Sequence, residues 1–272
     1  MLDLARRATP VHPHRGRRTA DVQYYTQHMS RSSHVHPPAP LLVVIPAHNE
    51  AESLAELLPQ IQSRGTTVLV VSDASRDATA EVARAHGARV LQLPVQLGAW
   101  GATQAGLRFA LRHGFRHVVT LDADGQHEPA CIGDLLAAQR ESGAEVVIGT
   151  FPERLSRARL LAWRWFRALT GLRVEDLTSG FRCYGPRAIE VLASAEATLL
   201  DYQDVGVLLL LRKHGLAVRE TPVQMYPRRN GRSKVFASWL LVAHYMLQTT
   251  VLCLSRVGRL SLPRRRYADA PT

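Results

Sequence analysis

The chain has 272 residues, a formal net charge of +11 and 46% hydrophobic residues, and this apolar share is ordinary for a globular protein. Its length allows one large domain or two small ones, and its basic charge favours an anionic partner such as a nucleic acid, an anionic lipid or a phosphorylated substrate. The cysteines Cys131, Cys183 and Cys253 lie far apart without CxxC spacing, which indicates free thiols in a reducing compartment.

The N-terminal part, residues 1–40, holds arginines, histidines and prolines but lacks the apolar run of a secretory signal. A segment of this composition buries too little apolar surface to fold, so we expect a disordered extension. Order is expected to begin at Leu41, where a continuous apolar run starts. We therefore predict a folded domain over residues 41–234.

From residue 41 to residue 149, short apolar runs alternate with segments of helical hydrophobic period. This alternation is typical of a Rossmann-like α/β fold, in which a mostly parallel sheet carries helices on both faces. The expected strands cover residues 41–45, 68–71, 89–93, 117–121 and 144–149. The expected helices cover residues 51–63, 77–86, 98–113 and 129–140.

Polar side chains follow three of the expected strands at the point where each one ends. Asn49 and Glu50 follow the first strand, Asp73 follows the second, and Asp122 and Asp124 follow the fourth. Because the carboxyl ends of parallel strands meet at one edge of a sheet, where such folds bind their ligands, we expect these side chains to gather there.

The spacing of Asp122 and Asp124, with the amide of Gln126 nearby, suits a hard divalent ion that keeps some of its waters. The alternative is a strand end with an Asp-capped turn, since Asp-Gly is a common turn pair. A nicotinamide or flavin site is disfavoured, because no GxGxxG follows the first strand and the spaced glycines Gly98 and Gly101 follow the third.

Five motifs resemble, in the same order, those of the family 2 glycosyltransferases, which have the GT-A fold. The closest resemblance is to the dolichyl-phosphate mannose synthase-like branch. The motifs are VVIPAHNE at 43–50, VSDAS at 71–75, DADGQH at 122–127, DLTSGFR at 176–182 and RRNGRSK at 228–234. Three positions depart from the family pattern. Gln96 stands where asparagine is usual, Trp100 where glycine is common, and Phe151 where an arginine often meets the donor diphosphate.

On the donor side, the resemblance implies a nucleotide-sugar site and a bound Mg²⁺ or Mn²⁺. The ion would be held by Asp122, Asp124 and Gln126. Asp73 is expected to accept a hydrogen bond from the base or ribose, although it can also be a helix-flanking cap, and Glu50 can be an ordinary first-turn acid. The residues expected to contact the donor are Pro46, Asn49, Glu50, Asp73, Gly98 and Asp122.

On the acceptor side, the resemblance implies catalytic roles for Asp204, Asp176 and Arg182. A sugar hydroxyl needs a general base, for which Asp204 is the first choice and Asp176 the second. A lipid phosphate is already mostly a dianion near pH 7, so it needs cations for positioning instead of a base. Arg182 is expected to help hold it. Residues 178–182, which include Arg182, are expected to be too polar and glycine-bearing to belong to the core. The expected acceptor-phosphate ligands are Arg228, Ser233 and Lys234.

The C-terminal segment at residues 235–260 is largely apolar and has basic flanks. We expect an amphipathic helix lying in the plane of the membrane interface, with its basic flanks attracted to anionic lipid. A single transmembrane helix and a buried core helix are the alternatives. Residues 261–272 are expected to form a basic flexible tail.

These features predict an inverting, metal-dependent glycosyltransferase, peripheral to the cytoplasmic face of a membrane. It would move a sugar from a nucleotide-sugar donor to a polyprenyl-phosphate or lipid-linked acceptor, with inversion carried over from the family. One alternative is sugar transfer to a saccharide hydroxyl in polysaccharide synthesis. The other, from a different class, is a basic nucleic-acid-binding protein; that function gives no reason for acids at three strand ends, so no nucleic-acid partner is expected.

Overall fold

The computed structural model describes residues 41–151, 164–165, 167–168, 170–172, 174–177, 179–198, 200, 205–226 and 250–251. Apart from residues 250 and 251, the predicted N-terminal extension (1–40), amphipathic helix (235–260) and basic tail (261–272) lie outside these ranges and stay predictions. Within the described ranges, no helix combines the length and apolar character needed to cross a membrane.

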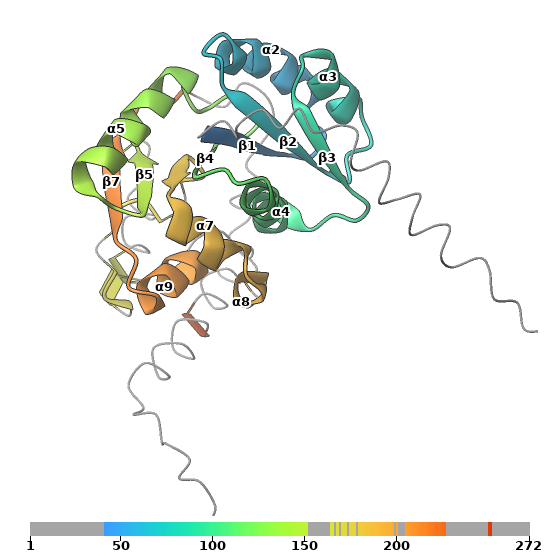
Figure 1. The fold of residues 1–272 in the computed structure, drawn as a ribbon. Coiled ribbons are helices and arrows are strands. Elements are labelled where there is room, and N and C mark those ends of the chain that lie inside the picture. The colour runs from blue at the N-terminus through green and yellow to red at the C-terminus, as the bar shows by residue number, and fades with distance from the viewer. Residues whose placement is uncertain are drawn as a thin grey trace, which may run out of the picture. The chain divides into compact units, whose positions relative to one another are not determined.

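A seven-stranded sheet forms the centre of the domain, in the order β3-β2-β1-β4-β6-β5-β7 (Figure 1). Neighbouring strands are parallel except at β6, which runs antiparallel to both β4 and β5. The predicted mostly parallel sheet is therefore confirmed. The strands are β1 (Leu41–Ala47), β2 (Thr67–Asp73), β3 (Arg89–Leu93), β4 (His117–Thr120), β5 (Val146–Thr150), β6 (Arg182–Tyr184) and β7 (Val218–Pro222).

Helices cover both faces of the sheet, as expected. The side chains of β1 alternate between two apolar clusters: Leu42 and Val44 pack with the side of α4, α7 and α9, whereas Val43 and Ile45 pack with the side of α2, α3 and α5. Figure 1 shows α2 and α3 on one side of β1–β3 and α4 on the other. The helices are α2 (Ala51–Gln62), α3 (Thr79–Ala85), α4 (Gly98–Arg112), the 3₁₀ turn η1 (Pro129–Cys131), α5 (Ile132–Ser142), α7 (Pro186–Ala193), α8 (Ala195–Thr198) and α9 (Val205–Lys213).

The expectation that residues 178–182 are too polar to be core is wrong. Phe181 and Arg182 have no exposed surface, and β6 begins at Arg182 in the middle of the sheet. The Arg182 guanidinium donates to the carbonyl oxygens of Ser179 (2.8 Å) and Leu177 (2.9 Å). A charged group is tolerated in a core when its N–H groups are hydrogen-bonded in this way, and hydropathy alone does not reveal that compensation.

The cysteines in the described part of the chain fit the sequence expectation. Cys131 and Cys183 are both buried free thiols, while Cys253 lies outside the described residues. Burial raises the pKa of Cys183 to about 12, so this thiol stays protonated at physiological pH. Both positions therefore serve packing in the folded protein.

Helix α4 connects the first half of the sheet to the helices that follow β6. It carries Trp100, Gln104 and Arg108 at helical spacing on one face. Trp100 is almost fully buried, and its indole N–H donates to the Ala197 carbonyl oxygen (2.8 Å) in α8. Trp100 thereby fills space that the glycine common in the family would leave empty. The other bonds run from Gln104 to the carbonyls of Leu192 and Ser194 and from Arg108 to the Ala193 carbonyl and the Thr198 hydroxyl.

We predict that Trp100→Phe lowers the free energy of unfolding by about 2 kcal/mol, because the buried Ala197 carbonyl loses its donor and ring volume is lost. Urea denaturation followed by circular dichroism measures this change. Leu111→Ala, at an exposed position on the same helix, is the control and is expected to change stability by less than about 0.5 kcal/mol. Equal stability of Trp100→Phe and the wild type would contradict a connecting role for the indole.

Candidate functional site

The sheet order brings the predicted site residues to one edge. Strands β2, β1 and β4 are adjacent and parallel, so their carboxyl ends lie side by side. Asp73, Asn49 and Asp122 leave the sheet at these three ends. Pro46 pairs in register with Val71 within the sheet, next to the same edge. The expected meeting of these strand ends at one edge of the sheet is therefore confirmed.

The loops after β1 and β2 are hydrogen-bonded to each other. The Asn49 N–H donates to the Ser75 hydroxyl (3.1 Å), and the Asn49 side-chain oxygen accepts from the Arg76 N–H (2.8 Å). Asn49 has a φ of 57°, in the left-handed region that asparagine tolerates better than most residues. Asn49 thus has a structural function in joining the two loops, and its predicted contact with the donor stays a prediction.

Glu50 directly precedes helix α2, as its N-cap, and is hydrogen-bonded within the same pair of loops. Its N–H donates to the Thr79 hydroxyl (3.0 Å), and its carboxylate accepts from the Ser53 hydroxyl (3.1 Å). The next residue, Ala51, donates its N–H to Asp77 Oδ2 (3.1 Å). Burial raises the pKa of Asp77, but hydrogen bonds from the Thr79 hydroxyl and from backbone N–H groups outweigh burial and lower it overall. These contacts favour the alternative in which Glu50 is a first-turn helix acid.

Asp73 is buried, with an exposed fraction of 3%, and its carboxylate faces the start of α4. Asp73 Oδ1 accepts from the Leu97 N–H (2.7 Å), and Oδ2 accepts from the Gly98 N–H (2.9 Å). Asp73 therefore caps α4, about 25 residues downstream, rather than the helix that directly follows it. The predicted donor residues Asp73 and Gly98 are brought together by this pair of bonds.

The predicted metal motif forms a tight loop after β4. Asp124 is buried at 7% exposure, and its Oδ1 accepts from the Gln126 N–H (3.1 Å). Gln126 is buried too, and its carbonyl oxygen accepts from the Tyr226 N–H (2.8 Å). The side chain of Asp122, in contrast, is 45% exposed. The loop thus fixes its own backbone and presents Asp122 toward solvent.

Two residues outside the predicted site border Asp122. The Asp122 N–H donates to His127 Nδ1 (3.1 Å), and His127 Nε2 lies 3.9 Å from Asp122 Oδ2. A Cβ placed on Gly180 would lie only 2.6 Å from Asp122 Oδ1, so the backbone at Gly180 lies against the carboxylate. The structure therefore brings the motif at 122–127 together with the motif at 176–182.

Asp176 and Arg182 lie in the buried part of this second motif. Asp176 Oδ1 accepts from the Ser179 N–H (3.2 Å), and the Asp176 N–H donates to Glu220 Oε1 (2.8 Å). Burial, reinforced by the charges of Asp176 and Glu175, raises the pKa of Glu220, although backbone N–H donors oppose this shift.

The Arg182 guanidinium is buried and donates to the carbonyl oxygens of Ser179 and Leu177. These contacts favour a positioning role for Arg182 over contact with an acceptor phosphate.

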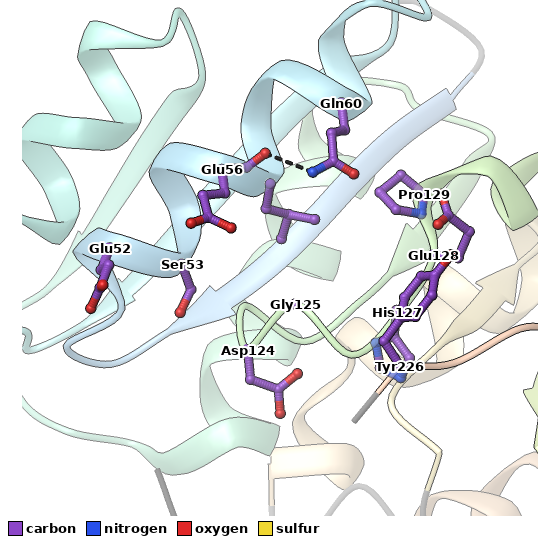
Figure 2. Close-up of a pocket in the computed structure, with 11 residues that line it drawn as sticks. Glu52, Ser53, Glu56, Gln60, Asp124, Gly125, His127, Glu128, Pro129 and Tyr226 are labelled. Carbon is purple, nitrogen blue, oxygen red and sulfur yellow. Dashed lines mark hydrogen bonds between the residues drawn. The ribbon is translucent and has the colours of Figure 1, made fainter. Parts of the chain in front are cut away.

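A hollow of about 330 Å³ lies beside the metal-motif loop (Figure 2). Figure 2 shows Glu52, Ser53 and Glu56 on α2 facing the loop that carries Asp124 and Gly125. Asp122 does not line this hollow. The hollow therefore belongs to the α2 side of the loop, and its remaining lining residues are Leu57, Gln60, His127, Glu128, Pro129 and Tyr226.

The chemistry of the motif loop fits a hard divalent ion. Asp122, Asp124 and Gln126 offer only oxygen acceptors for such an ion, as Mg²⁺ and Mn²⁺ prefer. In the described part of the chain, no group of three or more His, Cys, Asp or Glu side chains is placed to hold a metal. An ion bound here would therefore take further oxygens from a ligand's phosphates and from water.

Four of the predicted site residues lie outside the described residues, namely Asp204, Arg228, Ser233 and Lys234. His127 and Gly180 are the contacts that sequence reasoning missed, although both stand inside the quoted motifs. The contact of His127 could have been predicted from its position, because it follows Asp122 by five residues on the same loop. For Gly180 no local signal exists, since its contact with Asp122 depends on how β6 enters the sheet.

Comparison with known proteins identifies relatives over most of the chain. An undecaprenyl-phosphate mannosyltransferase of Micrococcus luteus is 32% identical over 217 residues, which cover 72% of this chain and 87% of that protein. A polyprenol monophosphomannose synthase of Mycolicibacterium smegmatis is 30% identical over 223 residues, covering 75% of this chain and 84% of that protein.

Solved structures share the fold at lower sequence identity. Glucosyl-3-phosphoglycerate synthase from Mycobacterium tuberculosis, in complex with phosphoglyceric acid, matches with a TM-score of 0.61 at 22% identity and covers 80% of each chain. The same enzyme in complex with Mn²⁺ and UDP-glucose matches with a TM-score of 0.59, covering 80% of this chain and 79% of that one. This likeness shows the GT-A fold. The model of glycosyl transferase family 2 matches residues 42–192, and with the relatives above it shows that the chain belongs to that family.

Proposed function

We propose that this chain transfers a sugar, with inversion at the anomeric carbon, from a nucleotide-sugar to a polyprenyl phosphate at the cytoplasmic face of a membrane. The observation that carries the proposal is the carboxyl edge of the sheet. There the half-exposed Asp122 and the buried Asp124 follow β4, next to β1, and Asp73 ends β2 on the other side of β1. The relatives named for undecaprenyl-phosphate mannosyltransferase and polyprenol monophosphomannose synthase activity support a lipid phosphate acceptor.

On the donor side, the Asp73 carboxylate is held by backbone N–H groups and can accept further hydrogen bonds. Each Asp73 oxygen accepts a backbone N–H, from Leu97 or Gly98, and a carboxylate oxygen has a second lone pair with which to accept from a ribose or base. A divalent ion held by Asp122 and Asp124 would neutralise the charge that develops on the departing diphosphate. Neighbours of the same fold solved with Mn²⁺ and UDP-glucose support this arrangement.

For a phosphate acceptor, an oxygen of the lipid phosphate attacks the anomeric carbon as the bond to the diphosphate breaks. This oxygen is already ionised near pH 7, so the protein has to position it rather than deprotonate it. We assign that task to Arg228, Ser233 and Lys234. A saccharide hydroxyl would instead need a carboxylate base, and Asp204 is preferred over Asp176 because Asp176 is buried and bonded to the Ser179 N–H.

We predict that one nucleotide-sugar stabilises the wild-type protein in the presence of Mn²⁺ by about 2.7 kcal/mol when its concentration is 100 times Kd. Thermal-shift measurements over a panel of nucleotide-sugars identify that donor. Asp124→Ala should lose the metal-dependent part of the shift and all turnover, because the motif loop loses a ligand and the acceptor of the Gln126 N–H. Asp134→Ala, which removes an exposed carboxylate in α5, should behave like the wild type.

Near-normal turnover of Asp124→Ala with saturating Mn²⁺ or Mg²⁺ would refute the metal role. A wild-type protein that no nucleotide-sugar stabilises would refute the donor assignment.

We predict that Arg228→Ala lowers turnover at least 100-fold, whereas Asp204→Asn keeps most of it, if the acceptor is a lipid phosphate. The expected reason is that a phosphate dianion needs a cation for positioning and no base. Turnover is measured as transfer of radiolabelled sugar to a short polyprenyl phosphate. Arg229→Ala is the matched control, since Arg229 stands beside Arg228 but at a variable position of the RxxGxSK motif. The reverse ranking of Arg228→Ala and Asp204→Asn would favour a hydroxyl acceptor.

We predict that the full-length protein cosediments with vesicles containing anionic lipid and that salt weakens this binding. Replacement of Arg264, Arg265 and Arg266 by glutamine should reduce the binding more than tenfold, because each basic residue near the surface contributes about 1 kcal/mol. Carbonate should extract the protein from membranes if residues 235–260 lie in the interface. Resistance to carbonate would instead show a spanning helix.

A further inference from the structure

Asp122 is the exposed member of the metal motif, and its exposure raises the question of what fixes its carboxylate. Its neighbours Leu121 and Ala123 are buried, whereas the Asp122 side chain is 45% exposed. A carboxylate that can adopt several rotamers loses conformational entropy when an ion fixes it in one of them, and this loss weakens ion binding. Groups that restrict the carboxylate beforehand would therefore strengthen ion binding.

His127 contacts Asp122 through both nitrogens of its ring. A backbone N–H can only donate, so the bond from the Asp122 N–H (3.1 Å) requires an unprotonated Nδ1. With Nδ1 as the acceptor, the ring proton lies on Nε2, which is 3.9 Å from Asp122 Oδ2. At this distance the Nε2–H group and Oδ2 interact electrostatically but do not form a hydrogen bond.

The imidazole has little room to turn. The His127 side chain is 1% exposed, and its ring stacks on Phe181 with centroids 5.1 Å apart and planes inclined by 22°. The bridge between His127 and Met225 fixes the backbone of His127 as well. The Nε2–H group is thus held at a constant place beside the Asp122 carboxylate.

Gly180 limits the space of the same carboxylate. A Cβ at this position would lie 2.6 Å from Asp122 Oδ1 and 2.8 Å from Oδ2, which is closer than side chains approach in real structures. The loop cannot easily move away, because the Thr120 hydroxyl donates to the Gly180 carbonyl (2.7 Å) and the Arg182 guanidinium holds the carbonyls of Ser179 and Leu177.

We propose that His127 and Gly180 are positioning residues that hold the Asp122 carboxylate in its ion-binding orientation, His127 through its Nε2–H and Gly180 by the absence of a side chain. This inference rests on the proposed function, because it assigns Asp122 to a divalent ion. It adds a specific requirement, namely that the ring proton of His127 lies on Nε2, the nitrogen that faces Asp122.

Two variants at His127 separate positioning from folding. His127→Asn retains an acceptor near the Nδ1 position but loses the Nε2–H, whereas His127→Gln places an N–H group near the Nε2 position and loses the Nδ1 acceptor. Mn²⁺ affinity in the presence of UDP or GDP, measured by electron paramagnetic resonance, should fall about tenfold in His127→Asn and less than threefold in His127→Gln. Melting temperatures should rank the other way, because the Asp122 N–H loses its acceptor only in His127→Gln. A purely structural role would lower affinity and melting temperature in the same order and would overturn the proposal.

The tautomer is tested in the metal-free protein. In ¹⁵N-histidine-labelled wild-type protein, the two ring nitrogens of His127 should give the widely separated shifts of an Nε2–H tautomer, in which Nδ1 carries no proton. His127→Asn identifies the signals by their loss. Two similar shifts, as in an imidazolium, or a protonated Nδ1 would overturn the assignment, and this result does not depend on any metal.

Gly180→Ala tests the second contact, with Gly133→Ala as its matched control. Gly180→Ala should lower Mn²⁺ affinity at least tenfold, because the added methyl group displaces the Asp122 carboxylate. At Gly133 in α5, an added Cβ meets nothing within 4 Å, so affinity should not change. Unchanged affinity in Gly180→Ala would overturn the role of Gly180. A wild-type protein that binds no Mn²⁺ would instead overturn the metal role of Asp122, and the positioning roles with it.

Discussion

The antiparallel pairing of β6 with β4 is the constraint on which the rest of the site depends. It sets Arg182 opposite Thr120 and Tyr184 opposite Val118, with β5 paired on the other side of β6. Because the two strands run in opposite directions, the residues before β6 leave the sheet where β4 delivers Asp122. Gly180 is thereby placed against the Asp122 carboxylate, and Phe181 against the His127 ring. The two sequence motifs form one site because of this strand pairing.

Most of the fold could be predicted from the sequence because its determinants are local. The apolar runs in β1 and β2 and the helical period of α2 are visible in any window of a few residues. Strand β6 could not be predicted in this way. It has three residues, starts with an arginine and pairs with a strand about 60 residues earlier. Its stability depends on carbonyl partners for Arg182 that exist only in the folded chain.

The site shows the same division between local and distant information. That Asp73, Asn49 and Asp122 meet at one edge follows from strand alternation and parallel pairing, both of which the sequence indicates. The partners of these residues are distant: Asp73 binds the start of α4, and Asn49 binds the loop after β2. Family membership favours the glycosyltransferase interpretation over nucleic-acid binding, for which net charge was the sole support.

Helix α4 connects the predicted donor side to the start of the predicted acceptor side. The N–H groups of Leu97 and Gly98, at its N-terminus, donate to the Asp73 carboxylate, and the dipole of the helix favours a negative charge there. Its side chains Trp100 and Gln104 bond the carbonyls at the end of α7 and in α8, directly before the chain segment that carries Asp204. Trp100 departs from the glycine common in the family, and the departure is explained by this bond. A single helix therefore connects the predicted nucleotide contact to the start of the predicted acceptor side, and a glycine at position 100 would lack both the buried ring and the bond to Ala197.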